Sequence, residues 1–305
     1  MALGASIPKT RLYVILARKS PTAVVFRRGP SKQVLMLSWN TELHQFRMGQ
    51  WFKGRIYEHR CDLSPSGEKL IYFAARHRGP LATWTAISRP PFLTALALWP
   101  KGDSWGGGGL FSNERTVGLN HLPGKMVLAE GFKLQKSLQI ESCGPLSGRG
   151  EDDPIWSSRM KRDGWKLKQQ KDRATYKSSK HRRIRWKFEQ PEIWTRTRGP
   201  WTLEMSLLGL YEMDGPWHVV EHRVLDSRRN VVIDLGRSDW ADWSRSGDLL
   251  FARDGRLHRV PEQGDSGFGV PEELIDLRAL KFTPREAPPE ALVWSGREPR
   301  GEIIR

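Results

Sequence analysis

An internal repeat constrains the fold of this chain more than any other feature of its sequence. Residues 62–73 read DLSPSGEKLIYF, and residues 242–251 read DWSRSGDLLF. Four residues match without a gap: Asp62, Ser64, Ser66 and Gly67 align with Asp242, Ser244, Ser246 and Gly247. In each copy a Ser-Gly pair, which permits positive φ, precedes an apolar strand, as in a β-hairpin. A hairpin that recurs in this way predicts a repeat architecture.

Short β-rich stretches bounded by turn residues fill most of the remaining chain. They are rich in Val, Ile, Phe, Tyr, Trp and Thr, which is typical of strands, and the clearest are 11–17, 33–40, 69–75, 83–88, 94–99, 202–211, 230–236 and 248–254. Long stripes of helical period are missing, and the best helix candidate is Pro271–Leu280, which has acids at its start. A loose count gives about twenty strands, enough for about five blades of four strands each.

At the repeat the chain resembles TolB-like and WD-repeat β-propellers of an uncharacterised bacterial type, whose blades carry a Ser-Pro-Asp-Gly turn before an apolar strand. Residues 64–67, SPSG, are close to that turn, and residues 244–247, SRSG, match it more loosely. The resemblance implies an all-β propeller of about five four-stranded blades, closed by pairing of the N- and C-terminal strands. Residues 1–305 would then form a single domain, with 141–158 as a long loop or a possible linker within it. Two unrelated hairpins in a β-sandwich are the alternative.

Composition narrows the setting. The two cysteines, Cys61 and Cys143, are too few for a disulfide framework or a thiolate metal site. The longest apolar patch near the N-terminus, residues 12–17, is too short for a signal-peptide core, and no run reaches the roughly 18 residues of a membrane span. We therefore expect a cytoplasmic protein, monomeric on its own, that does not bind membranes. The net charge of +16 favours an acidic partner.

The segment from Arg159 to Lys187 carries most of this charge, with thirteen Lys and Arg against Asp163 and Asp172. Cations alternate with apolar residues in it, which predicts strands with a buried apolar face and a basic outer face. Trp165, Tyr176 and Trp186 are expected to point inward, so base stacking is not assumed. The predicted binding residues, a single basic wall, are Lys166, Lys168, Arg182, Arg183, Arg185 and Lys187. The wall could bind a polyanion or an acidic protein surface, or it could be a solvated edge protected by its charges.

Catalytic and metal motifs are weak. His218, Glu221 and His222 match the His-x-x-Glu-His string of inverted zinc peptidases, which needs a helix to bring both imidazoles to one metal. The flanking Gly215-Pro216 and internal valines predict a strand instead, so we expect no metal and no other cofactor. The glycine run 106–109 lacks the Lys-Ser/Thr of a phosphate loop and predicts a flexible loop. Asp62 and Asp242 are interpreted as structural acceptors for the turns of their repeats, not as a catalytic pair.

These observations predict a non-catalytic β-propeller scaffold that binds a protein partner or larger complex through its loops and basic surface. The alternative is a sequence-independent nucleic-acid-binding protein, for RNA or DNA, that acts through phosphates. An enzyme with a hydrolase site in the central channel of a propeller is a third class, without a specific residue to support it.

Overall fold

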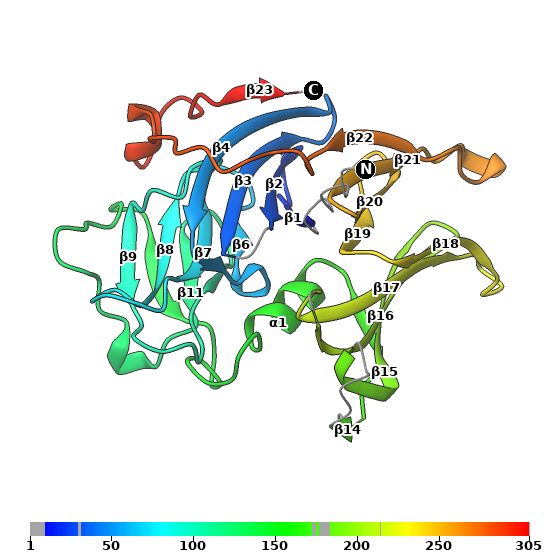
Figure 1. The fold of residues 1–305 in the computed structure, drawn as a ribbon, viewed down its shortest axis with the longest axis horizontal. Coiled ribbons are helices and arrows are strands. Elements are labelled where there is room, and N and C mark those ends of the chain that lie inside the picture. The colour runs from blue at the N-terminus through cyan, green and yellow to red at the C-terminus, as the bar shows by residue number, and fades with distance from the viewer. Residues whose placement is uncertain (1–9, 30–31, 173–174, 177–183, 214, 305) are drawn as a thin grey trace, which may run out of the picture. The chain divides into compact units, whose positions relative to one another are not determined.

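The computed structural model of the chain describes residues 10–29, 32–172, 175–176, 184–213 and 215–304 (Figure 1). The described chain is all-β, and its single α-helix is α1 (Ile155–Arg162). None of its helices is both long and apolar enough to span a membrane. The chain forms two compact units: unit one contains residues 1–12 and 160–279, and unit two contains residues 13–159 and 280–305.

Unit two holds three sheets, which we call A, B and C. Sheet A has the strand order β1 (Arg11–Leu16, which begins in unit one), β2 (Thr22–Arg28), β3 (Gln33–Asn40), β4 (Gln45–Lys53) and β23 (Glu302–Ile304). Sheet B contains β5 (Arg55–Ile56), β6 (Asp62–Leu63), β7 (Leu70–Ala75), β8 (Thr83–Ser88) and β9 (Ala97–Pro100). Sheet C contains β10 (Gly109–Phe111), β11 (Thr116–Leu119) and β12 (Gln139–Ser142), with β12 parallel to β11.

Two apolar cores join these sheets inside unit two. One core combines residues of sheets A and B, including Phe26, Met36 and Tyr72. The other combines residues of sheets B and C, including Trp99 and Phe111. Apolar side chains of sheet A are therefore buried against sheet B, and others of sheet B are buried against sheet C.

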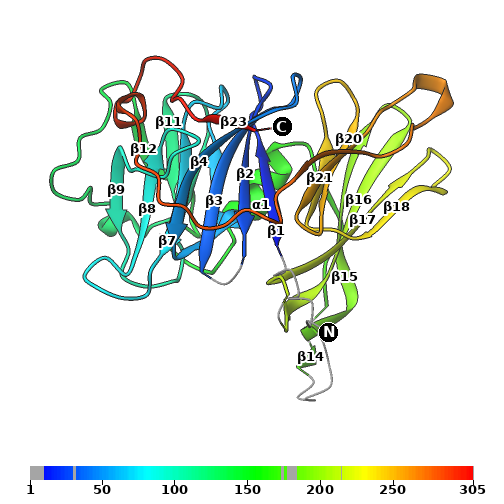
Figure 2. The same cartoon turned by 45° about the horizontal axis from the view of Figure 1, so that its top comes forward.

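Unit one holds the remaining two sheets, D and E. Sheet D contains β13 (Lys166–Gln169), β14 (Thr175–Tyr176), β15 (Ile184–Arg198), β16 (Trp201–Glu212), β17 (His218–Leu225) and β18 (Val231–Arg237). Its long antiparallel strands β15 to β18 run side by side in Figure 2. Sheet E contains β19 (Trp240–Trp243), β20 (Leu249–Arg253), β21 (Arg256–Val260) and β22 (Glu272–Asp276). The 3₁₀ turns of the two units are η1 (Glu58–Arg60), η2 (Pro123–Lys125), η3 (Gly264–Ser266) and η4 (Pro289–Leu292).

The two copies of the repeat form equivalent hairpins, β6–β7 in sheet B and β19–β20 in sheet E. Gly67 and Gly247 both have positive φ, +83° and +115°. In both turns the glycine N–H donates to the carbonyl of the serine three residues earlier, at 2.8 Å in the first and 3.3 Å in the second. The sequence repeat is thus a structural repeat, and the glycines are required by the backbone.

Several expectations differ from the structure. The segment expected as a helix, 271–280, contains strand β22, because its acids pair with arginines of β21: Arg256 Nε lies 3.3 Å from Glu273 and 3.1 Å from Asp276. In the described part of the chain, only sheet E has four strands, while the other sheets have three, five or six. The terminal strands β1 and β23 share sheet A but lie at opposite edges, since β23 pairs with β4.

The segment expected as a loop, 141–158, includes the end of β12 and the start of α1. The helix begins just after Asp153 and Pro154, and the carboxylate of Asp153 accepts the N–H of Ser157 at 3.2 Å. An acidic residue followed by proline is a helix-start signal, because the proline lacks a donor that the first turn would leave unpaired.

Candidate functional site

The predicted basic residues that the structure describes lie on two strands of sheet D. Lys166 and Lys168 are exposed on β13, and Arg185 and Lys187 are exposed on β15. Between them the strands turn apolar residues inward: Leu167 and Ile184 are half-buried and Phe188 is buried. The alternation of cationic and apolar residues therefore produces exposed charges, as its period of two predicts. Arg182 and Arg183 lie outside the described residues.

The described cations of the predicted basic wall lie beside two different parts of β15. β13 pairs with the far half of β15, where Lys166 is opposite Thr195. Lys187 lies eight residues earlier in the same strand, next to the short strand β14. At a strand rise of about 3.3 Å per residue these positions are separated by at most about 26 Å. We therefore distinguish two basic patches: the β13 patch, Lys166 and Lys168, and the β15 patch, Arg185 and Lys187.

Neighbouring acids neutralise some other cations of this segment. Lys171 forms an ion pair with Glu192, and Arg162 Nε lies 2.8 Å from the carboxylate of Asp163. In the described part of unit one, no carboxylate lies within 4.0 Å of the ammonium groups of the two patches, Lys166, Lys168 and Lys187. Their charge is thus available to an anion from outside.

The aromatic residues of the segment differ in burial. Trp165 is 5% exposed and belongs to the interior, as expected. Trp186 is half-buried and lies on the same face of β15 as Ile184 and the buried Phe188. It packs beside Tyr211 and Trp217, with ring centroids 6.1 and 5.7 Å away. No alternation in the sequence links these three residues, because they meet across strands. Tyr176 is described only by its backbone, which pairs with Trp186.

The His-x-x-Glu-His string lies on strand β17, which confirms the predicted strand. His218 and His222 are four residues apart, about 13 Å along an extended strand, so the two imidazoles do not converge on one metal. His222 is 2% exposed, and its Nδ1 shares a hydrogen bond of 2.8 Å with the Ser238 hydroxyl. Burial lowers the pKa of His222 to about 3, which makes it a neutral core histidine.

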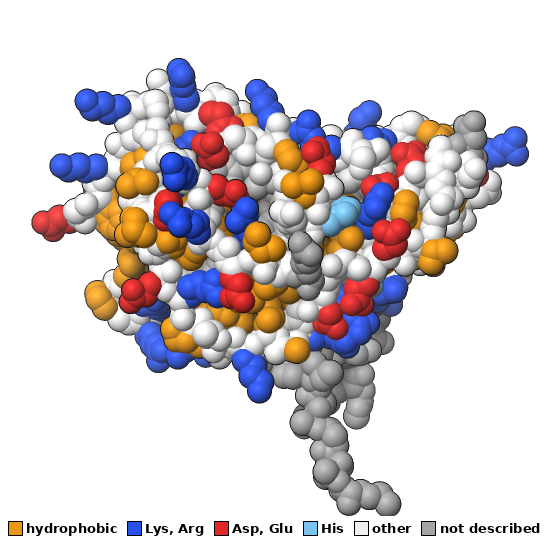
Figure 3. All heavy atoms as spheres, turned by 90° about the horizontal axis from the view of Figure 1, so that it is seen from above, with side chains coloured by type: hydrophobic (Ala, Val, Ile, Leu, Met, Phe, Trp, Pro, Cys, Tyr) orange, Lys and Arg blue, Asp and Glu red, His pale blue; other side chains and the backbone are white. Residues whose placement is uncertain are grey.

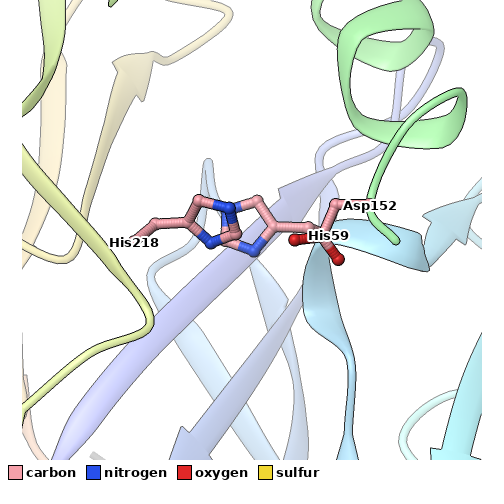
Figure 4. A group of neighbouring side chains, drawn as sticks. All are labelled: His59, Asp152 and His218. Atoms are coloured by element: carbon pink, nitrogen blue, oxygen red, sulfur yellow. The ribbon is translucent and has the colours of Figure 1, made fainter. Parts of the chain in front are cut away.

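In unit two, His59 and Asp152 bring a ring nitrogen and a carboxylate oxygen within 4.8 Å of each other (Figure 4). Asp152 also accepts a hydrogen bond of 3.0 Å from Nε of the buried Arg60. Figure 4 also draws His218, which belongs to unit one. Two ligands are fewer than the three or four that proteins use to hold zinc, and the described residues of unit two add no third ligand to this pair. We interpret the Arg60–Asp152 pair as structural.

Asp62 and Asp242, interpreted as structural acceptors, each accept a backbone N–H. Asp62 is fully buried and accepts the backbone N–H of Phe111 in sheet C at 2.7 Å. Asp242 forms an ion pair with Arg196 of sheet D and accepts the N–H of Trp243 at 2.8 Å. Desolvation raises the pKa of Asp242, although Arg196 opposes this shift. Each aspartate therefore links its hairpin to a neighbouring sheet.

The glycine run 106–109 forms a loop as far as Gly108, as its composition predicts, but this loop is closely packed. All four residues are buried, and 106–108 have positive φ. An added Cβ at Gly107 would overlap the ring of Phe73, and one at Gly108 would overlap the Arg60 carbonyl. The glycines are therefore required by close packing.

Charge elsewhere on the surface is mixed. On the face that Figure 3 shows, Lys and Arg side chains are interspersed with Asp and Glu.

Comparison with family models, curated proteins and solved structures gives no match for this chain. The candidate function therefore rests on the residues themselves.

Proposed function

We propose that this protein is a non-catalytic binding scaffold whose partner is nucleic acid, held through its phosphates by the basic patches of sheet D. The observation that carries the proposal is the exposure of Arg185 and Lys187 on β15 and of Lys166 and Lys168 on β13. These strands lie in the segment that holds thirteen cations and two acids. Such a local excess of positive charge is the electrostatic signature of a phosphate-binding surface.

The spacing of the patches suits a polymer better than a small anion. Eight residues of strand span at most about 26 Å, which corresponds to roughly eight base pairs at a rise of 3.4 Å each. A nucleic acid presents phosphates at regular intervals over this length, so one molecule can contact both patches. Phosphate contacts fix position without reading bases, and the binding is expected to be independent of sequence.

The same proposal includes a propeller as the scaffold. It is supported by five sheets that follow one another along the chain, by the apolar cores between sheets A and B and between B and C, and by the return of β23 to sheet A. Propeller blades are small antiparallel sheets arranged in sequence order, and sheet C departs from them in its parallel pair β11–β12.

A mobility-shift experiment tests the proposed function. The probe is a labelled DNA duplex of 16 base pairs, and the competitors are an unlabelled duplex of different sequence and oligoglutamate of equal charge. We expect both duplexes to bind equally well and oligoglutamate to compete weakly. Tight binding of oligoglutamate with no shift of DNA would replace nucleic acid with an acidic protein as the partner. Binding of neither polymer would show that the patches are a solvated face.

A further inference from the structure

Three aromatic side chains gather at the surface where β15 meets the β16–β17 turn. The rings of Trp186, Tyr211 and Trp217 have centroids 5.7 to 6.1 Å apart and interplanar angles of 62° to 66°. We call them the aromatic cluster. Tyr211 is 42% exposed, and both tryptophans are half-buried. Edge-to-face contacts account for the packing of the rings with one another, but they leave part of the cluster facing solvent.

The backbone at Tyr211 is strained. Its φ is +56°, in the left-handed region that a bulky residue rarely occupies. The strain is held by the turn, because the N–H of Tyr211 donates to the carbonyl of Trp217 at 2.6 Å and that of Glu212 donates to Pro216 at 2.9 Å. Glycine or asparagine would fit this backbone at lower cost. The stability of the fold alone would favour glycine or asparagine here, yet the chain has a tyrosine with an exposed ring. Backbone outliers of this kind often lie at ligand-binding sites.

The β15 patch adjoins the aromatic cluster. The guanidinium carbon of Arg185 lies 5.1 Å from the ring centroid of Trp186 and 5.7 Å from that of Tyr211, within the range of a cation–π contact. Lys187, the residue after Trp186, is exposed on the opposite face of the strand. The cation of Arg185 and the aromatic rings are therefore presented together, which matches the two halves of a nucleotide: an anionic phosphate and a base with a flat π-face.

We propose that the aromatic cluster stacks the bases of a single-stranded nucleic acid while Arg185 holds a neighbouring phosphate. This inference rests on the proposed function and adds to it a preference for single strands. Bases of a duplex are already stacked on one another, whereas those of a single strand are free to lie on side-chain rings. The charge of the patch, opposite to that of the phosphates, selects this partner over an uncharged apolar one.

The experiment compares two probes of equal charge by fluorescence anisotropy. One is a labelled twelve-residue oligothymidylate, and the other is a twelve-residue phosphodiester that carries no bases. We expect the protein to bind oligothymidylate more tightly, by about fivefold to 150-fold for each stacked base. Equal affinity for the two probes would overturn the inference and leave the proposed function intact. If the protein bound neither probe and did not bind duplex DNA, the inference and the proposed function would both be contradicted.

Substitution of Tyr211 assigns the preference to the aromatic cluster. Tyr211→Gly removes the ring and suits the positive φ, so relief of backbone strain offsets part of the lost ring packing and the variant should remain folded, as a cooperative urea transition checks. It should lose most of the preference for oligothymidylate and keep its affinity for the abasic probe. Tyr211→Phe, the matched control, should keep the preference. A Tyr211→Gly variant that is folded and retains the full preference would contradict the role of the cluster, and so would an equal loss for both probes.

Discussion

The turn at Gly67 allows a quantitative test of the repeat, because the structure separates backbone strain from crowding. Gly67 has φ +83°, and a Cβ added there would lie 2.6 Å from Cβ and 2.7 Å from Cγ2 of Thr22. Gly79, in the same unit, has φ +76°, and a Cβ there would meet nothing within 4 Å. Substituting alanine at each position therefore imposes similar strain, while only Gly67→Ala also forces atoms together.

The magnitudes follow from these two effects. A left-handed backbone destabilises a residue that has a Cβ by about 1–2 kcal/mol. Replacing glycine also makes the unfolded chain less flexible, which stabilises the folded state by about 0.4–1 kcal/mol. We expect Gly79→Ala to lower the free energy of unfolding by roughly 1 kcal/mol or less. The overlap with Thr22 adds about 1–3 kcal/mol, so Gly67→Ala should cost roughly 2–4 kcal/mol.

Urea unfolding, monitored by tryptophan fluorescence, measures both variants in the transition of unit two. The m-value should stay constant, so that the shift of the midpoint reports stability alone. The background variant Thr22→Gly removes both crowded atoms, and in it the cost of Gly67→Ala should fall to that of Gly79→Ala. Equal costs for Gly67→Ala and Gly79→Ala in the parent protein would refute the reasoning about the turn.

Two further predictions concern buried charge in sheet D. Burial holds the pKa of His222 near 3, below the value of 6.5 in the unfolded chain, so the unfolded state binds more protons and stability falls as the pH drops from 6.5 toward 3. The loss of stability should approach about 1.4 kcal/mol per pH unit. The variant His222→Gln should lack this pH dependence in urea midpoints measured between pH 7 and 4.5. The same pH dependence in the variant and the parent would contradict the assignment. Glu204 is 2% exposed, with Arg223 Nε at 2.7 Å and Arg229 at 3.0 Å. Replacing both arginines with methionine should lower the free energy of unfolding by about 3–5 kcal/mol. Adding Glu204→Met should recover most of that loss, because the unpaired carboxylate is then removed. A triple variant as unstable as the double one would show that packing, not charge, determines the loss.

Local patterns predicted the strands well, and the exceptions have physical causes. The stretches 33–40 and 83–88 coincide with β3 and β8, since alternation and turn residues at both ends act over a few neighbours. Acids at the start of the predicted helix 271–280 were misleading, because Arg256 and Arg259 of β21 pair with Glu273 and Glu272 across the sheet. Such partners are distant in the sequence, and tertiary pairing overrides local propensity.

The candidate site was predictable only in part, for the same reason. The exposure of Lys166, Lys168, Arg185 and Lys187 followed from alternation within single strands. The separation of the patches depends on which half of β15 pairs with β13, and no pattern in the sequence predicts that register. The aromatic cluster combines β15 with the β16–β17 turn, so only the folded chain brings Trp186 to Tyr211.

The salt dependence of DNA binding tests the central claim most directly. The variant Arg185→Glu/Lys187→Glu reverses the β15 patch, and Arg78→Glu/Lys136→Glu changes the net charge equally at exposed residues of unit two. Both variants should remain folded, because exposed substitutions usually alter stability by about 0.5 kcal/mol each. The slope of log K against log salt concentration should shrink by about two units for the β15 variant, one for each phosphate that the patch no longer holds, and should stay near that of the parent for the control. Equal slopes for all three proteins would contradict the claim that the β15 patch holds nucleic acid.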